Sequence, residues 1–150
     1  METRKHIHQI ELAAAPAEVF KLLITPSAIR GWWGASRAIV APRAGGVWAA
    51  AWGDDEDIPD YVTVHKIKAI EPPRRLFLAD TKYFAKSGPP PFQANLTTEF
   101  LIEPTADGSI LQVTQDGFPA DAVADEFYAA CEKGWCDTFN SVKRYLEQTG

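Results

Sequence analysis

The sequence contains few of the residues that mark several classes of protein. Among its 150 residues there are only two Cys and one Met. No apolar run approaches the roughly 18 residues needed to cross a membrane. Basic residues are outnumbered, with 15 Lys and Arg against 20 Asp and Glu, for a net charge of −5. Because nucleic acids and anionic membranes are bound by clustered basic charge, this balance argues against both as partners.

The two cysteines are poorly placed to form a disulfide. Cys131 and Cys136 are five residues apart in a segment expected to be helical, which places them about 140° apart around its axis. There is also no apolar N-terminal segment behind basic residues, the pattern of a secretion signal. Together these features predict a cytoplasmic protein with free thiols.

Aromatic residues, in contrast, are abundant. The chain has five Trp, four Tyr and eight Phe, and 46% of its residues are hydrophobic. Its length suits a single domain over residues 1–150, large enough for a full core without disulfides or metals. Each aromatic side chain can bury about 150–250 Å². These side chains therefore either fill a large core or line a pocket.

Hydropathy periods and turn residues predict one strand, two short helices and six further strands. The expected strands are His6–Leu12, Ile39–Val40, Val47–Trp52, Tyr61–Ile70, Leu76–Asp80, Asn95–Glu103 and Ile110–Gln115. Pro16 opens the first expected helix, Pro26 stops it, and the second covers Ser27–Trp32. Because short loops join the later strands, an antiparallel meander is expected.

A long helix is expected at the C-terminus. From Asp121, a plausible N-cap, an apolar stripe recurs at helical spacing. It consists of Val123, Phe127, Cys131, Trp135, Phe139, Val142 and Leu146. A helix of about 26 residues is on the order of 39 Å long and must cross the whole molecule. The sequence thus predicts an α+β fold in which a curved antiparallel sheet of about seven strands wraps around this helix.

Six short motifs, in order over roughly residues 5–148, resemble one family. They are Pro16-Ala17-Glu18-Val19-Phe20, Ile29-Arg30-Gly31-Trp32-Trp33, Gly45-Gly46-Val47-Trp48, Ile70-Glu71-Pro72-Pro73-Arg74-Arg75-Leu76, Thr97-Thr98-Glu99-Phe100 and Gly134-Trp135-Cys136-Asp137-Thr138-Phe139. The sequence is similar to homologues of the activator of heat-shock protein 90 ATPase, within the START-like (SRPBCC, birch pollen allergen-like) helix-grip superfamily. The resemblance implies a hydrophobic cavity between the long helix and the concave sheet, which relatives use to hold apolar or amphipathic molecules.

The strand Tyr61–Ile70 carries an unusual set of inward residues. Lys66 and Lys68 mark one face as solvated, which turns Tyr61, Thr63 and His65 towards the interior, together with Ile67 and Ala69. A buried polar group without a hydrogen bond costs about 1–3 kcal/mol. These three side chains therefore need protein partners, which an ordinary core could supply, or the water of a cavity.

The long helix and a second strand supply the rest of the candidate site. Gly134 interrupts the helix beside the stripe, either to allow close packing against a strand or to widen a pocket. Trp48 and Trp52 share one face of their strand. The expected ligand-binding residues are Trp33, Trp48, Trp52, Tyr61, Thr63, His65, Thr98, Phe127, Cys131 and Trp135.

Binding of a small hydrophobic or amphipathic molecule, without a cofactor, is the favoured function, and other functions remain open. An enzyme could use His65 with Tyr61, with or without Asp80, as an acid–base group. The resemblance also implies an ATPase-activating partner of a chaperone, although the namesake has an additional N-terminal domain. Self-association as a homodimer would be marked by an exposed apolar patch.

Two further features have alternative interpretations. His6 and His8 share a strand face and could hold a metal only with a third ligand such as His65, so they are expected to face solvent and no metal is expected. The loop from Tyr83-Phe84 to Phe92, rich in Gly and Pro, is either a lid over the cavity mouth or a structural connection.

Overall fold

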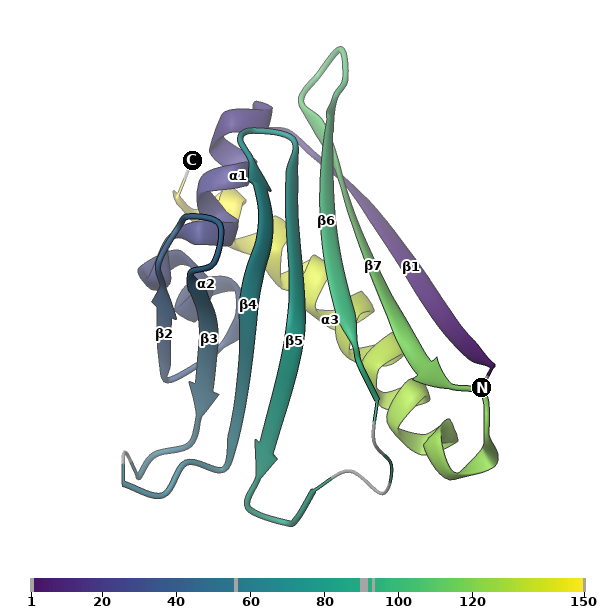
Figure 1. Ribbon diagram of the computed structural model, residues 1–150. Helices are drawn as coiled ribbons and strands as arrows, with labels where there is room; N and C mark the ends of the chain where they lie inside the picture. The colour runs from purple at the N-terminus through teal and green to yellow at the C-terminus, as the bar shows by residue number, and fades with distance from the viewer. Residues whose placement is uncertain (1, 56, 90–91, 93, 150) are drawn as a thin grey trace.

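The computed structural model describes residues 2–55, 57–89, 92 and 94–149. It has the expected α+β helix-grip architecture (Figure 1). The strands are β1 (Thr3–Leu12), β2 (Arg37–Val40), β3 (Val47–Trp52), β4 (Tyr61–Glu71), β5 (Arg75–Ala85), β6 (Thr97–Pro104) and β7 (Ser109–Pro119). The helices are α1 (Pro16–Ile24), α2 (Pro26–Trp33) and α3 (Asp125–Thr149). All strand pairs are antiparallel, in the order β1-β7-β6-β5-β4-β3-β2.

The short helix α1 ends before Pro26, as expected, and Pro26 is the first residue of α2 rather than a residue between the helices. Proline has no N–H, so the carbonyl of Leu22, four residues earlier, lacks its normal helical partner. The indole of Trp32 supplies the missing donor, with Nε1 2.8 Å from the Leu22 oxygen, and the indole of Trp48 donates to the Leu23 carbonyl at 2.7 Å. Two buried tryptophans therefore cap α1 and tie it to α2 and to the sheet.

The strand β4 has the predicted alternation over its first half. Thr63, His65 and Ile67 are buried, while Lys66 and Lys68 are exposed. A register irregularity between Ile67 and Ala69 then reverses the faces, so that Ile70 pairs with buried Leu76 and packs against the core. The prediction that Ala69 faces inward and Ile70 outward was therefore wrong, because a β-bulge shifts the period of two.

The strands β5 and β6 are joined over only part of their length. Their pairing covers Arg75–Leu78 with Thr98–Leu101. Beyond it, Asp80 has a positive φ of 51° and β5 continues to Ala85, five residues past the predicted end. The strands separate here, and this leaves side-chain space on the concave face of the sheet.

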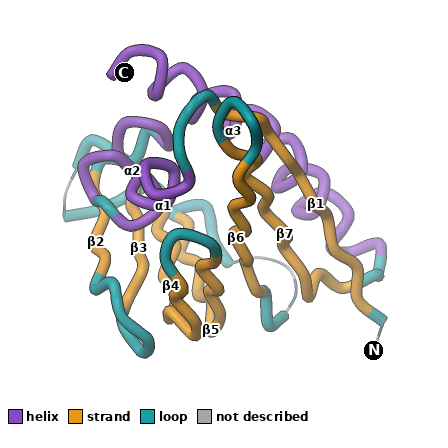
Figure 2. Tube along the Cα trace, turned by 90° about the horizontal axis from the view of Figure 1, so that it is seen from above, coloured by secondary structure: helices purple, strands orange, loops and turns teal. Residues whose placement is uncertain are grey.

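The helix α3 crosses the same face of the sheet as α1 and α2 (Figure 2). It begins at Asp125 rather than at Asp121, because a 3₁₀ turn over Ala122–Ala124 precedes it. Asp121 makes no side-chain capping bond, and Val123 is 51% exposed, so neither has its predicted role. At Gly31, a Cβ would overlap the ring of Tyr145, so glycine permits the close approach of α2 to α3.

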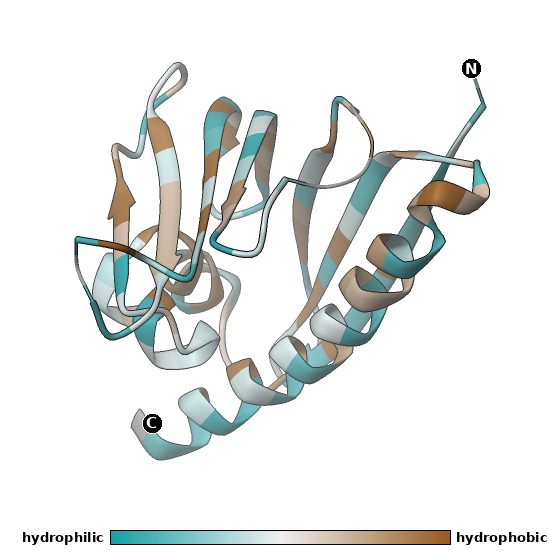
Figure 3. Ribbon diagram, turned by 90° about the horizontal axis from the view of Figure 1, so that it is seen from below, coloured by the Kyte–Doolittle hydropathy of each residue, from teal (hydrophilic) through white to brown (hydrophobic). Residues whose placement is uncertain are grey.

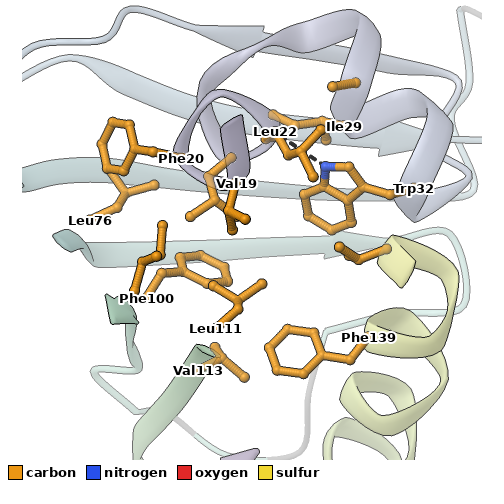
Figure 4. Close-up of a cluster of buried hydrophobic side chains, with 14 of the residues drawn as sticks. Val19, Phe20, Leu22, Ile29, Trp32, Leu76, Phe100, Leu111, Val113 and Phe139 are labelled. Atoms are coloured by element: carbon orange, nitrogen blue, oxygen red, sulfur yellow. Dashed lines mark hydrogen bonds between the residues drawn. The ribbon is translucent and has the colours of Figure 1, made fainter. Parts of the chain in front are cut away.

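The main hydrophobic core lies between the short helices, the sheet and the second half of α3 (Figure 4). Side chains such as Val19, Ile29, Phe100, Leu111 and Phe139 are almost fully buried there. Along the strands, hydrophilic and hydrophobic residues alternate (Figure 3). In the part of the chain that the structure describes, no helix has the length and apolar character to span a membrane.

The loop after β5 bears on the lid hypothesis. Pro90 and Pro91 lie outside the described residues, as does Gln93. The ring of Phe92 lies 5.2 Å from the ring of Phe127, between centroids. The lid therefore stays a prediction.

Candidate functional site

A pocket of about 140 Å³ lies between the concave face of the sheet and α3. It occupies the region beside the point where β5 and β6 separate. Its lining residues are Trp33, Trp48, Tyr61, Thr63, His65, Leu78, Tyr83, Thr98, Phe100, Gln115, Cys131, Gly134, Trp135 and Thr138. The volume is close to that of an engineered cavity of about 150 Å³ that binds benzene. It is below the range of roughly 300–1,000 Å³ that suits drug-sized molecules.

Most of the residues singled out from the sequence meet in this pocket. Those in its lining are Trp33, Trp48, Tyr61, Thr63, His65, Thr98, Cys131 and Trp135. Trp52 and Phe127 lie one layer behind it. The ring of Trp52 contacts those of Trp33 and Tyr61, and the ring of Phe127 contacts that of Tyr83.

Tryptophan rings form one wall of the pocket. The ring of Trp33 at the end of α2 lies 5.5 Å from that of Trp48 and 5.8 Å from that of Trp135, between centroids. Phe100 packs edge-on against Trp135 at 5.6 Å. Three different elements, α2, β3 and α3, thus place flat apolar surfaces around the same space.

A row of hydroxyl and imidazole groups lies next to the tryptophan rings, with the ring of His65 5.4 Å from that of Trp48 between centroids. His65 is 4% exposed, and both of its ring nitrogens are occupied. Nε2 lies 2.7 Å from the Thr63 hydroxyl and Nδ1 lies 2.8 Å from the Thr81 hydroxyl, which in turn donates to the Leu96 carbonyl at 2.9 Å. Two of the polar side chains predicted on the inner face of β4, Thr63 and His65, are therefore partnered by each other and by Thr81 of β5.

Burial drives the titratable groups of the pocket towards their neutral forms. It lowers the pKa of His65 to about 4 and raises the pKa of Cys131 to about 12. Burial also raises the pKa of Tyr61 and of Tyr83, with smaller electrostatic contributions from neighbouring groups that include Cys131. A pocket of this kind disfavours a charge of either sign.

Gly134 lines the pocket from α3. A Cβ built at this position meets no heavy atom within 4 Å. The interpretation that Gly134 allows close packing against a strand was therefore wrong. Its missing side chain leaves open space next to Trp135.

Asp80 does not belong to this site. Its side chain is 59% exposed and forms an ion pair with Lys68 at 3.0 Å on the outer face. The positive φ at Asp80 and the bulge opposite it turn the side chain away from His65. The hypothetical acid–base group of His65, Tyr61 and Asp80 is therefore not assembled.

The histidines of β1 differ from their expected solvent-facing position. His6 is 4% exposed, its Nδ1 lies 3.1 Å from Nε2 of His8, and Nδ1 of His8 lies 3.5 Å from Sγ of Cys136 on α3. Burial, and then the neighbouring His8, lowers the pKa of His6 to about 4. These residues were mispredicted because α3 covers the inner face of β1.

His65 is too far across the sheet to complete a metal site with them. Three strands, β7, β6 and β5, lie between β1 and β4. Within the described ranges, no group of three His, Cys, Asp or Glu residues could hold a metal ion.

Several lining residues were not identified from the sequence. Tyr83 lies beyond the predicted end of its strand, and Gln115 is the last residue of another predicted strand. Phe100 shares the inner face of its strand with Thr98, and Thr138 follows Trp135 by three residues in a helix. The periods of two and 3.6 residues could have identified Phe100 and Thr138. Tyr83 could not be placed in the same way, because the change of direction at Asp80 has no sequence signal.

A second, larger hollow of about 370 Å³ lies on the outer face of the sheet. Its walls come from β2, β3 and β4 and are mainly small or aliphatic side chains such as Ala49, Val62 and Val64. Ile39, at the edge of the sheet, is 64% exposed. Arg37 is the one charged residue in the lining, so this hollow has few groups that could orient a small ligand. It is instead the exposed apolar patch that self-association would require.

Comparison with solved structures shows the same fold in proteins of several bacteria. A crystal structure of a Mesorhizobium loti protein superposes with a TM-score of 0.79 at 20% identity, covering 98% of this chain and 99% of that one. A Rhizobium leguminosarum protein gives a TM-score of 0.78 at 18% identity, with 98% and 96% covered. An AHSA1-like protein from Aeromonas hydrophila gives 0.73 at 18% identity, with 98% and 94% covered.

Comparison of the sequence with curated proteins finds no match. The model of one protein family, described as Activator of Hsp90 ATPase homolog 1-like protein, matches residues 13–147, nearly the whole helix-grip fold. The chain therefore belongs to the family of Activator of Hsp90 ATPase homolog 1-like proteins.

Proposed function

We propose that this protein binds a small hydrophobic or amphipathic molecule in the pocket between the sheet and α3. The observation that carries the proposal is a space of about 140 Å³ that is lined both by tryptophan rings and by a row of polar groups. Ligand sites combine largely apolar walls with a few polar groups that fix orientation. This pocket has both.

The hydrogen bonds of His65 support binding over acid–base catalysis. A general base must reach the proton that it removes. Both ring nitrogens of His65 are already bonded to Thr63 and Thr81. A polyketide cyclase-like or hydrolase-like activity remains the alternative, and it predicts that His65→Ala abolishes turnover of a candidate substrate.

Titration with a small aromatic probe tests the binding proposal. Toluene and p-cresol suit the volume of the pocket, and ¹H–¹⁵N spectra report on the indole N–H groups of Trp48 and Trp32. We expect saturable shifts at Trp48, which lines the pocket, and smaller ones at Trp32, which does not. Absence of saturable shifts with either probe would contradict the proposed function.

A pair of variants on α3 locates the binding. Gly134→Leu places a side chain in the open space of the pocket and should abolish the shifts. Ala130→Leu makes a similar addition at an exposed position of the same helix outside the lining and should leave them unchanged. Equal binding by both variants would place the probe elsewhere.

We also propose that the chain forms a homodimer that pairs through β2. This strand ends the sheet, and its outer edge has unpaired backbone groups. In an antiparallel pair centred on Ile39, each Ile39 faces the other copy's Ile39, and the apolar hollows lie on one continuous face. Sedimentation equilibrium should show a dimer that Ile39→Lys dissociates, and a monomer at all concentrations would contradict this.

Three further predictions concern a chaperone partner, the cellular location and the domain organisation. Activation of a chaperone ATPase rests on the description of the family alone, and an ATPase assay with the cognate chaperone tests it. The cytoplasmic location and the single domain likewise remain predictions, which cell fractionation and limited proteolysis would test.

A further inference from the structure

Gln115 places a buried hydrogen-bond acceptor at the pocket. This residue of β7 belongs to the pocket lining and is 5% exposed. Its Nε2 donates to the Thr98 hydroxyl oxygen at 3.2 Å, whereas its Oε1 has no hydrogen-bond partner in the part of the chain that the structure describes. Buried polar groups in folded proteins are nearly always paired. An exception in the wall of a cavity indicates a partner that enters the cavity.

The side chains on either side of Gln115 do not satisfy this oxygen. In the sheet, Gln115 lies between Thr98 of β6 and His6 of β1, and Thr98 bonds the amide nitrogen instead. Burial lowers the pKa of His6, and the nearby Gln115 amide partly opposes this effect. Nε2 of His6 is nevertheless also without a hydrogen bond among the described residues. Neither neighbouring strand therefore supplies a donor to Gln115 Oε1.

A ligand in the pocket can reach this acceptor at low cost. The terminal torsion of a glutamine side chain has a broad minimum, so a small rotation turns Oε1 towards the cavity. The oxygen has also lost its hydration already, because the folded protein buries it without a partner. A donor group on the ligand thus gains a hydrogen bond without the usual cost of removing water from the acceptor.

The described residues that line the pocket include no charged side chain. Among them there is no Lys, Arg, Asp or Glu, although such residues make up 23% of the sequence. His65, the one basic group present, has a lowered pKa because it is buried. A charged ligand would lose its hydration here and gain no ion pair in return.

The size and the aromatic lining of the pocket restrict the ligand further. A volume of about 140 Å³ accommodates one six-membered ring with a small substituent. The rings of Trp33, Trp48 and Trp135 offer flat contacts to such a ring. Aromatic pairs gain stabilisation beyond the area that they bury. The lining therefore favours an aromatic ring over an aliphatic one.

We propose that the pocket selects an uncharged, single-ring aromatic molecule whose hydroxyl or N–H group donates a hydrogen bond to Gln115 Oε1. Phenols are the simplest class with these properties. This inference rests on the proposed ligand-binding function and adds to it the charge, the size and the hydrogen-bonding polarity of the ligand. Gln115 is then a specificity-determining residue, and Thr98 holds its amide in place.

Three probes of nearly equal size test the hydrogen-bonding polarity by titration calorimetry at pH 8. Toluene has no polar group, 4-methylpyridine can only accept a hydrogen bond, and p-cresol can donate one. p-Cresol should bind more tightly than the other two. Equal or tighter binding of toluene or 4-methylpyridine would overturn this inference and uphold the proposed function. Failure of all three probes to bind would contradict the proposed function itself.

A second pair of probes tests the charge of the ligand. Benzyl alcohol and benzylamine have the same number of heavy atoms and both can donate a hydrogen bond, but the amine is a cation at pH 8. The amine should bind at least tenfold more weakly than the alcohol, because it loses more hydration on entering the pocket. Equal binding of the two would overturn the selection for an uncharged ligand.

The variant Gln115→Met removes the acceptor and keeps the length of the side chain. The affinity for p-cresol should fall by about tenfold, the upper end for one neutral hydrogen bond. The affinity for toluene should be unchanged. Gln112→Met is the matched control on the same strand, because the Gln112 amide lies outside the pocket lining and accepts a hydrogen bond from Gln9. An unchanged preference for p-cresol in Gln115→Met would overturn the proposal.

The side-chain carbonyl of Gln115 gives a direct readout that needs no substitution. Its ¹³C shift responds when the oxygen accepts a hydrogen bond. p-Cresol should move this signal, and toluene should move it much less. The Gln112 carbonyl, which already accepts from Gln9 at 2.6 Å, should be unaffected by either probe. Equal responses of the Gln115 carbonyl to p-cresol and toluene would overturn the proposal.

Discussion

His65 is a buried imidazole whose hydrogen bonds suit only its neutral form. Its pKa in the folded protein is lowered to about 4, against 6.5 for an exposed histidine. Between these two values the unfolded chain binds a proton at this position that the folded protein does not. The contribution of His65 to stability is therefore fully present above pH 6.5 and is lost as the pH falls towards 4.

The variant His65→Gln tests this linkage. The amide can still bond the Thr63 and Thr81 hydroxyls but does not titrate in this range. The free energy of unfolding of the unmodified protein should fall by about 3 kcal/mol more than that of the variant between pH 7 and pH 4. Urea unfolding at several pH values measures the difference. Parallel pH profiles would mean that His65 is protonated in the folded state.

The indole of Trp32 replaces a backbone donor that Pro26 cannot provide. Trp32→Phe leaves the buried Leu22 carbonyl without this partner and also removes buried volume, so it should destabilise the protein by about 3 kcal/mol. Trp52→Phe is the matched control, because Trp52 is only half-buried and its N–H contact is long, at 3.4 Å. The Trp52→Phe substitution should lower the free energy of unfolding by about 1 kcal/mol. If urea unfolding shows that Trp32→Phe and Trp52→Phe lose similar amounts of stability, the capping role of Trp32 is contradicted.

Gly134 lowers the intrinsic stability of α3. A glycine inside a helix costs about 1 kcal/mol relative to alanine. Because a Cβ at this position meets no atom within 4 Å, Gly134→Ala should stabilise the protein by about that amount while narrowing the pocket. The free energy of unfolding should thus rise in this variant, while its affinity for p-cresol falls.

The opposite substitution on the same helix is the control. Ala130 is exposed and lies outside the pocket lining, so Ala130→Gly should cost about 1 kcal/mol and leave binding unchanged. A Gly134→Ala variant that gains stability and binds p-cresol equally well would contradict a role for Gly134 in the pocket.

The sequence predicted elements better than it predicted their irregularities. Alternation correctly placed Thr63 and His65 on the inner face of β4, because hydropathy repeats every two residues along a regular strand. It failed at Ile70, where a bulge shifts the period, and it was not applied to Tyr83, which lies beyond the predicted end of its strand and the bend at Asp80. Such irregularities depend on pairing with a neighbouring strand, and this information is not local in the sequence.

At the scale of the whole molecule, some features depend on contacts between residues far apart in the chain, and local sequence patterns could not predict them. The apolar stripe predicted a long C-terminal helix, and six motifs indicated the fold. The burial of His6, however, depends on α3 lying across β1, more than a hundred residues away in the chain. The size of the pocket likewise follows from how sheet and helix separate, so the abundance of aromatic residues alone could not distinguish a filled core from a pocket.

Binding should stabilise the entire molecule. A ligand that binds only the folded state adds RT ln(1 + [L]/Kd), which is about 1.4 kcal/mol at ten times Kd. For a protein of this size, that raises the melting temperature by roughly 3–5 °C. Thermal unfolding with p-cresol should show this shift in the unmodified protein and none in Gly134→Leu. A shift in both would indicate binding outside the pocket.

The arrangement of the tryptophans has an optical consequence. The ring of Trp33 lies 4.8–5.8 Å from the rings of Trp32, Trp48, Trp52 and Trp135, so all five indoles of the chain form one connected group. Indoles at such separations exchange excitation energy, and light absorbed by any of them can be emitted by another. A molecule that quenches Trp33 or Trp48 in the pocket should therefore dim the emission of the whole group. Without any added label, the protein is its own optical reporter of pocket occupancy.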